Sequence, residues 1–230
     1  MARVVLLAGG SPHSHDFGTS GAALRDVLGE DGHEVQWVRH PDDLVDALAN
    51  DTVDALVVAA LWWQMLGEAY APWRDEFSFT TTTAVRELID TFVANGGGLL
   101  AVHTAPVCFD DWPEWGDIVG GAWQWDISWH PPQGEVHADI IAAHPVVEGL
   151  PAQIELVDEV YGGLRLADTI TPLAVATRGA DDEPQPVVWA HHYGEGRVVY
   201  DGFGHDAASM ANPHNATILR QGLRWVTEGS

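Results

Sequence analysis

Histidine and aromatic residues come directly after several apolar runs of this sequence. His15 follows the first run, and Trp63 follows a later one. His103 ends another run, and His205 comes shortly after the last. An imidazole, with an ordinary pKa of about 6.5, can take up or release a proton near neutral pH. If the runs are strands of one sheet, their ends bring these side chains together, and proton transfer is the chemistry that they offer.

A carboxylate and a phenol extend this set of candidates. Glu159 alternates with apolar neighbours on a predicted strand over residues 154–160, so its side chain points away from the core. Tyr161 shares that face, where its hydroxyl binds a substrate hydroxyl or its ring covers the sheet edge. His130 precedes two prolines and is predicted to lie in an exposed loop. The candidates for catalysis are His103, Glu159 and His205, and the candidates for substrate binding are His15, Trp63, His130 and Tyr161.

The same side chains also have structural interpretations. His103 can be a hydrogen-bonded core residue, and His205 can cap a turn. Glu159 can belong to a solvated strand face. His191 and His192 are adjacent on a predicted strand and face opposite ways, which argues against one ion bound by both.

The charge balance excludes several classes of function. The chain has 230 residues, of which 34 are acidic and 10 are basic, and its formal net charge is −24. Every basic residue is an arginine, so a Schiff-base lysine and a P-loop lysine are both impossible. Binding to nucleic acid or to an anionic membrane requires a basic surface, and we therefore expect neither partner.

Cysteine content and the first residues indicate a cellular location. Cys108 is the single cysteine, so no internal disulfide can form, and we expect a cytoplasmic protein. The apolar run at residues 3–8 is too short to span a membrane and lacks the cleavage pattern of a signal peptide. It is predicted to be the first buried strand.

Apolar runs alternate with amphipathic segments through the first half, which predicts a parallel sheet with helices on both faces. Thr19 or Ser20 is the predicted cap of the first helix, and residues 61–79 are predicted to be irregular. The predicted strands are residues 3–8, 33–38, 55–60 and 99–103, and the predicted helices include residues 42–49 and 80–94.

Shorter strands are predicted for the second half of the chain. Gly194-Glu195-Gly196 is typical of a hairpin turn, and Pro213 begins a closing helix that runs to Thr227. Neither a repeat nor a long linker is present, so residues 1–230 are predicted to form one domain. The predicted strands are residues 134–140, 154–160, 173–177, 187–191 and 197–202.

A series of motifs resembles the ThuA-like, or trehalose-utilisation, family. The run GGLLAVHTA at residues 97–105 is similar to the family's glycine-rich strand, which ends in a histidine. The order and spacing of the motifs extend over roughly residues 94–226. The other matches are DWPEW at 111–115, HPVVEGLP at 144–151, DEVY at 158–161, YGEGRVVY at 193–200 and Gly204-His205.

The resemblance implies a flavodoxin-like, doubly wound and mainly parallel α/β fold related to class I glutamine amidotransferases. It also implies a role in bacterial sugar utilisation. In the amidotransferases, a nucleophilic cysteine occupies the tight turn after the strand that corresponds to residues 99–102. Here His103 holds that place, and Cys108 lies five residues later. We therefore predict no glutaminase activity and no catalytic role for Cys108.

Two classes of function follow. The first is an enzyme acting on trehalose or a related keto-sugar, by His/Glu acid–base chemistry or with a divalent metal such as zinc; the sequence has no HExxH spacing. The second is a non-catalytic sugar-binding or interaction module on an amidotransferase-like scaffold. Eleven tryptophans agree with a small-molecule sugar partner, because an indole face suits the C–H surface of a pyranose, or they fill irregular surfaces. The sequence leaves open whether the chain forms a homo-oligomer.

Overall fold

The computed structural model describes residues 1–49, 52–177 and 183–228. The strands are β1 (Arg3–Leu7), β2 (Glu34–Val38), β3 (Ala55–Val58), β4 (Gly98–Val102), β5 (Gly121–Ala122), β6 (Gly134–Ile140), β7 (Gln153–Asp158), β8 (Arg165–Leu166), β9 (Thr171–Ala176), β10 (Gln185–Tyr193) and β11 (Gly196–Asp201). The α-helices are α1 (Phe17–Gly29), α2 (Asp43–Leu48), α3 (Ala71–Phe77), α4 (Thr83–Ala94), α5 (Pro113–Val119), α6 (Ala207–Met210) and α7 (Pro213–Thr227), and the 3-10 helices are η1 (Glu68–Tyr70) and η2 (Pro145–Val147).

Within the described residues, nine strands form one sheet in the order β2-β1-β3-β4-β11-β10-β9-β6-β7. From β2 to β4 the neighbours are parallel, as the first half of the sequence predicted, and β11 pairs with β4 in parallel as well. From β11 to β7 they are antiparallel, so the sheet is mixed. The order β2-β1-β3-β4 is that of a flavodoxin-like doubly wound fold, whose ligands bind at the carboxyl ends of the strands.

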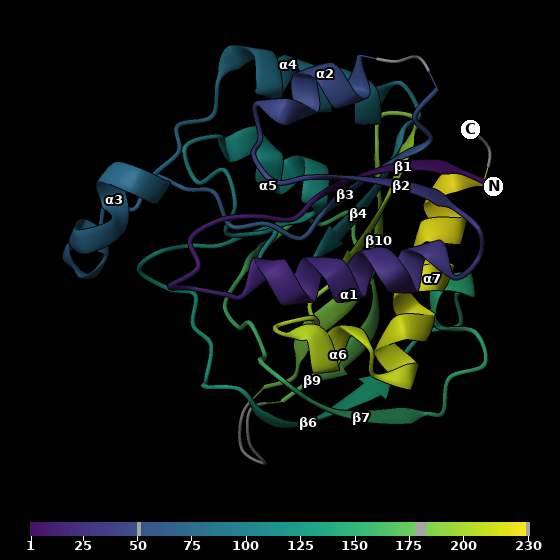
Figure 1. Ribbon diagram of the computed structural model, residues 1–230. Coiled ribbons are helices and arrows are strands. Elements are labelled where there is room, and N and C mark those ends of the chain that lie inside the picture. The colour runs from purple at the N-terminus through teal and green to yellow at the C-terminus, as the bar shows by residue number, and fades with distance from the viewer. Residues whose placement is uncertain (50–51, 178–182, 229–230) are drawn as a thin grey trace.

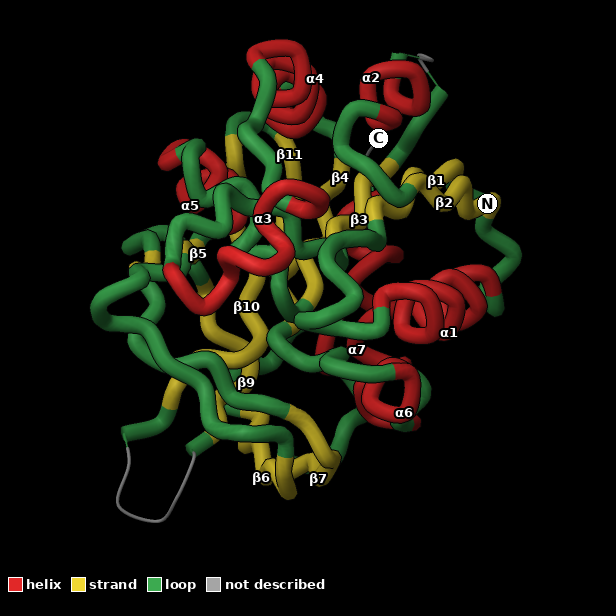
Figure 2. The backbone as a smooth tube through the Cα atoms, turned by 60° about the vertical axis from the view of Figure 1, so that its left-hand side comes forward, coloured by secondary structure: helices red, strands yellow, loops and turns green. Residues whose placement is uncertain are grey.

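Helices cover both faces of the sheet, as Figures 1 and 2 show. Helices α1, α6 and α7 lie on one side, and α2, α4 and α5 lie on the other. In β1, Val4 and Leu6 pack with the first group, whereas Val5 and Leu7 pack with the second. Because successive side chains of a strand alternate in direction, a strand covered on both faces has to be apolar throughout.

No helix among the described residues is long and apolar enough to cross a membrane.

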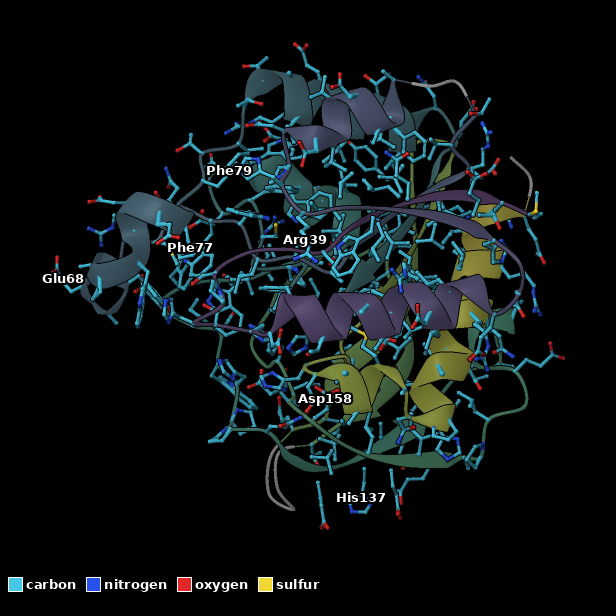
Figure 3. All side chains as sticks on the ribbon, in the orientation of Figure 1. Arg39, Glu68, Phe77, Phe79, His137 and Asp158 are labelled. Carbon is cyan, nitrogen blue, oxygen red and sulfur yellow. The ribbon has the colours of Figure 1, made fainter. Side chains whose placement is uncertain are left out.

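Two local predictions for the first half are wrong. Helix α1 is capped by Asp16, whose carboxylate accepts hydrogen bonds from the main-chain N–H groups of Gly18 and Thr19, so it begins before the predicted cap at Thr19 or Ser20. The predicted irregular stretch contains η1 and α3. These two helices form an arm that projects from the body, with Glu68 at its outer end (Figure 3).

The loop after β1 depends on a glycine at its start. A Cβ atom at Gly9 would lie 2.0 Å from the main-chain oxygen of Arg39, which cannot rotate away. We expect Gly9→Ala to lower the free energy of unfolding by about 1–3 kcal/mol, the usual cost of overpacking, as measured by urea denaturation. Gly29→Ala is the matched control, since nothing lies within 4 Å of its added Cβ. Equal stability of the two variants would contradict this account.

Candidate functional site

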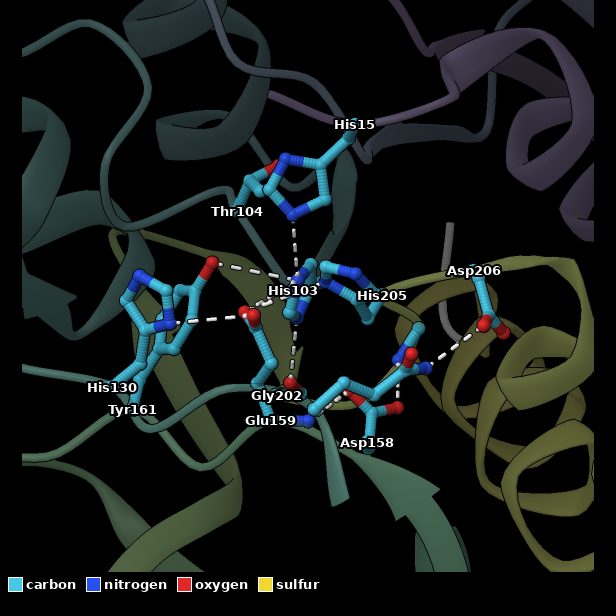
Figure 4. A network of polar contacts seen from close by, with 12 residues as sticks. His15, His103, Thr104, His130, Asp158, Glu159, Tyr161, Gly202, His205 and Asp206 are labelled. Atoms are coloured by element: carbon cyan, nitrogen blue, oxygen red, sulfur yellow. Dashed lines mark hydrogen bonds and ion pairs between the residues drawn. The ribbon is translucent and has the colours of Figure 1, made fainter. Parts of the chain in front are cut away.

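Side chains from four separate loops meet at the carboxyl ends of the strands. His15 follows β1 and His103 follows β4, while His205 follows β11. Glu159 follows β7, at the edge of the sheet. We call these four residues the central cluster (Figure 4), because one nitrogen or oxygen atom from each lies within 4.8 Å of the others. The sequence predicted that His103 and His205 lie together, and their ring centroids are 5.4 Å apart.

His103 occupies a tight turn directly after β4. Its φ of 48° lies in the left-handed region, which is uncommon for residues other than glycine. Two hydrogen bonds hold the turn. The main-chain N–H of His103 donates to the main-chain oxygen of Asp201 at 2.7 Å, and the hydroxyl of Tyr200 donates to the main-chain oxygen of His103 at 3.0 Å. This backbone ends the strand at Val102, one residue earlier than predicted, and directs the imidazole into the cluster.

Hydrogen bonding fixes which ring nitrogen of His103 is free. Nδ1 lies 3.0 Å from the main-chain oxygen of Gly202, which can only accept, so Nδ1 carries the hydrogen and Nε2 keeps its lone pair. Burial lowers the pKa of His103, which favours the neutral ring. Nε2 lies 3.1 Å from Nε2 of His15 and 3.4 Å from the hydroxyl oxygen of Tyr161. The sequence predicted His15 as a substrate-binding residue, and the structure places it in the central cluster.

Glu159 brings a buried carboxylate to these rings. It is 5% exposed and lies beyond the end of β7, not on the solvated strand face that was one interpretation of the sequence. Oε1 lies 3.3 Å from Nδ1 of His130. Oε2 lies 3.4 Å from Nδ1 of His205 and 3.6 Å from Nε2 of His103. Burial by itself raises the pKa of Glu159, but these imidazoles outweigh it and hold the pKa well below the ordinary value.

The imidazoles of the central cluster and of the neighbouring His130 have pKa values shifted in opposite directions from the ordinary value. Burial, followed by the nearby rings of His103 and His205, lowers the pKa of His15 to about 3. The carboxylate of Glu159 raises the pKa of His205 and that of His130. The cluster therefore combines neutral rings with rings that take up a proton readily.

Asp158 attaches the edge of the sheet to the site. Its Oδ2 accepts hydrogen bonds from the N–H of Gly204, at 2.8 Å, and from the hydroxyl of Ser209. Its Oδ1 accepts from the N–H of Glu159 at 2.7 Å. Asp158 is 1% exposed and lies inside the body (Figure 3). Asp158 was not predicted as a site residue, although an acidic pair after an apolar segment was the signal that the sequence offered.

Aromatic side chains border the central cluster. The ring of Tyr161 lies 4.9 Å from that of His103 and 5.4 Å from that of Trp123. Burial raises the pKa of Tyr161, so its hydroxyl keeps its proton. Trp63 packs in the same hydrophobic group as Tyr161. The indole N–H groups of Trp63 and Trp123 are buried and have no hydrogen-bond partner among the described residues. Trp123 was not among the predicted site residues.

Several other histidines lie outside the site. His144 accepts a hydrogen bond from the N–H of Val146 at 3.2 Å, in agreement with a structural role. His191 is buried and His192 is exposed on the opposite face of β10, where it packs against Trp225. Neither of them joins the central cluster.

Cys108 lies beyond the turn that His103 occupies. It is 1% exposed, and its Sγ accepts a hydrogen bond from the N–H of Trp62 at 3.4 Å. Burial raises the pKa of the thiol far above its ordinary value, so the reactive thiolate is disfavoured.

The fold and the cluster define a class: a flavodoxin-like α/β domain with a histidine at the turn after its fourth strand. The family model of ThuA, described as trehalose utilisation, matches residues 3–226. The chain belongs to the ThuA family.

Solved structures agree with this fold. A ThuA-like protein from Parabacteroides merdae ATCC 43184 superposes with a TM-score of 0.79 at 21% identity, covering 100% of this chain and 91% of that one. A ThuA-like protein from Bacteroides uniformis ATCC 8492 has a TM-score of 0.72 at 17% identity, covering 97% and 90%. Cytoplasmic Protein STM1381 from Salmonella typhimurium LT2 has a TM-score of 0.67 at 17% identity, covering 97% and 99%. No curated protein matches the chain by sequence.

The ion pair between His130 and Glu159 can be tested by titration. In protein treated with a chelator, Glu159→Gln removes the charge that raises the pKa of His130, and burial then lowers it. We expect the midpoint of the His130 ring signal, followed by NMR against pH, to move to lower pH. The signal of His137, which lies near Glu155 on the surface, is the control and should not move. A His130 midpoint that stays in place would contradict the pairing.

Proposed function

We propose that this chain is an enzyme of bacterial carbohydrate utilisation that acts on trehalose or a related keto-sugar, by acid–base or metal-assisted chemistry. The observation that carries the proposal is the convergence of three imidazoles on the buried carboxylate of Glu159. A group of titratable side chains buried at the carboxyl ends of parallel strands is typical of an active site. The description of the family as trehalose utilisation supports a sugar substrate.

The cluster suits reactions at a sugar oxygen or beside a sugar carbonyl. Such reactions need a group that accepts a proton and another that donates one. His103 has a lowered pKa and a free Nε2, while His205 has a raised pKa, so the two rings favour opposite protonation states. Pairs of groups whose environments separate their pKa values are how enzymes assign an acid and a base near neutral pH.

The aromatic border supports recognition of a neutral, polar ring. Trp123 and Tyr161 offer apolar faces beside the cluster. The buried indole N–H of Trp123 lacks a partner among the described residues, and a buried donor of this kind is costly unless a ligand accepts from it. A sugar hydroxyl is such an acceptor. A non-catalytic sugar-binding module would use the same border, and the turnover assay below separates it from an enzyme.

Glutaminase activity is not part of this proposal. An amidotransferase places a cysteine thiolate at the turn after the fourth strand, where this chain has His103. The burial of Cys108 and the raised pKa of its thiol support this exclusion. We propose a cytoplasmic location and a small-molecule sugar as the partner, with neither nucleic acid nor a membrane.

Turnover should depend on the central cluster. We expect His103→Ala and Glu159→Gln to lower kcat by about 10²–10⁴-fold, the usual effect of losing a group that transfers protons. The assay follows trehalose and 3-keto-disaccharides, with and without added zinc or manganese.

Cys108→Ser is the control for this experiment, and we expect it to keep its activity. Melting curves show whether each variant is folded. Parent-like turnover by folded His103→Ala and Glu159→Gln would reject the catalytic assignment. Parent protein that binds these sugars without converting them would favour the binding module.

The indole N–H of Trp123 should contribute to substrate affinity. Trp123→Phe keeps an aromatic face and removes the donor. Since a neutral hydrogen bond contributes about 0.5–1.5 kcal/mol, we expect KM to rise about 2–10-fold with little change in kcat. Trp225→Phe is the control. Trp225 lies on helix α7, away from the cluster, and packs against His144. Equal KM values for both variants would remove Trp123 from the substrate site.

A further inference from the structure

We infer that the central cluster is a binding site for a divalent transition metal ion of the zinc type, with Nε2 of His15, Nε2 of His103, Oε2 of Glu159 and Nδ1 of His205 as ligands. The four side chains point toward one another from separate loops (Figure 4). The binding site stands on this geometry alone, whereas its use in catalysis rests on the proposed function.

Three distances between the ligand atoms are close to those around a small cation, and all four atoms lie within 4.8 Å of one another. Nε2 of His15 and Nε2 of His103 are 3.1 Å apart. Oε2 of Glu159 lies 3.6 Å from Nε2 of His103 and 3.4 Å from Nδ1 of His205. Four ligands at zinc bond lengths of about 2.0–2.1 Å form a tetrahedron whose corners are about 3.3–3.4 Å apart. These three separations lie on either side of that value.

Groups outside the cluster hold the ligands in the orientation that a metal needs. The oxygen of Gly202 accepts from Nδ1 of His103 and leaves Nε2 free to bind. His130 lies beside Oε1 of Glu159 and leaves Oε2 directed inward. In metal sites, such outer contacts fix the tautomer of the imidazole and the direction of the carboxylate. The cluster therefore has two layers of contacts, which a chance group of histidines does not need.

Two of the proposed ligand atoms make only the ion-pair contacts of the cluster itself. Oε2 of Glu159 and Nδ1 of His205 are buried and lack a hydrogen-bond partner among the described residues. Buried polar atoms are normally satisfied, so each unsatisfied atom requires an explanation. A bound cation would satisfy both of them.

The chemistry of the donors selects the kind of metal. Three imidazole nitrogens and one carboxylate oxygen favour zinc and neighbouring first-row ions over magnesium or calcium, which prefer oxygen ligands. Such an ion would polarise a sugar carbonyl or hydroxyl that approaches it. The ligand rings would then no longer transfer protons, and His130, with its side chain 44% exposed, would remain able to exchange protons with solvent.

Metal binding can be measured without any substrate. We expect the purified protein, first treated with a chelator, to bind about one zinc ion per chain by calorimetry and mass spectrometry. A hundredfold excess of zinc over its Kd should raise Tm by about 5–10 °C, because binding stabilises the native state. Cobalt should bind the same site and give the visible absorption of a tetrahedral ion.

Variants separate this site from adventitious binding by surface histidines. His15→Gln and Glu159→Gln each remove a ligand, and we expect zinc affinity to fall by more than about 100-fold. His130→Gln removes an outer contact, for which a loss of about 10–100-fold is typical. His137→Gln changes an exposed histidine and should bind zinc as the parent does. Loop residue His15 keeps the test valid if Glu159→Gln fails to fold.

The outcomes distinguish this inference from the proposed function. A parent protein that binds no zinc, or ligand variants that bind zinc as tightly as the parent, would overturn the metal site whatever the turnover assay gives. Zinc binding that is lost in the ligand variants supports the metal site, even if neither trehalose nor a keto-disaccharide is converted. That last result would reject the sugar chemistry alone.

Discussion

The burial of the parallel strands on both faces is the constraint on which the rest of this molecule depends. A strand such as β1 is covered by α1 on one side and by α2 on the other, so its residues 4–7 have no place for a polar side chain. Polar groups are therefore confined to the strand ends and the loops that follow them. Parallel strands have their carboxyl ends at one edge, which collects His15, His103 and His205 there.

The antiparallel half of the sheet supplies the one group that the parallel half lacks. Glu159 follows β7, five positions away from β4 in the sheet order, and it would not reach His103 from a flat sheet. The hydrogen bonds of Asp158 to Gly204 and Ser209 attach the end of β7 to the loop after β11. The two adjacent carboxylates thus differ in role. Asp158 joins the end of β7 to the loop after β11, whereas Glu159 provides the buried negative charge of the site.

That charge organises the cluster electrostatically. A carboxylate that is 5% exposed is expensive to bury unless cationic or hydrogen-bonding partners surround it. His130 and His205 supply these partners, and their pKa values rise in return. His15 and His103 are kept neutral mainly by burial. The buried charge therefore accounts for the proton affinity of His130 and His205, whereas burial accounts for the neutral rings of His15 and His103.

Local patterns in the sequence determined the layers, the parallel half of the sheet and the closing helix Pro213–Thr227, because hydrophobic periodicity and end signals act over a few residues. They also placed His103 at the end of an apolar run, next to the strand that the structure ends at Val102. Strand ends and the cap of α1 were displaced by a few residues, since a side chain such as Asp16 or a φ such as that of His103 decides them. Only the tertiary structure brought His15 and Glu159 into contact range of His103. Their meeting depends on the strand order and on the Asp158 hydrogen bonds, which join segments far apart in the chain and leave no periodic signal in it.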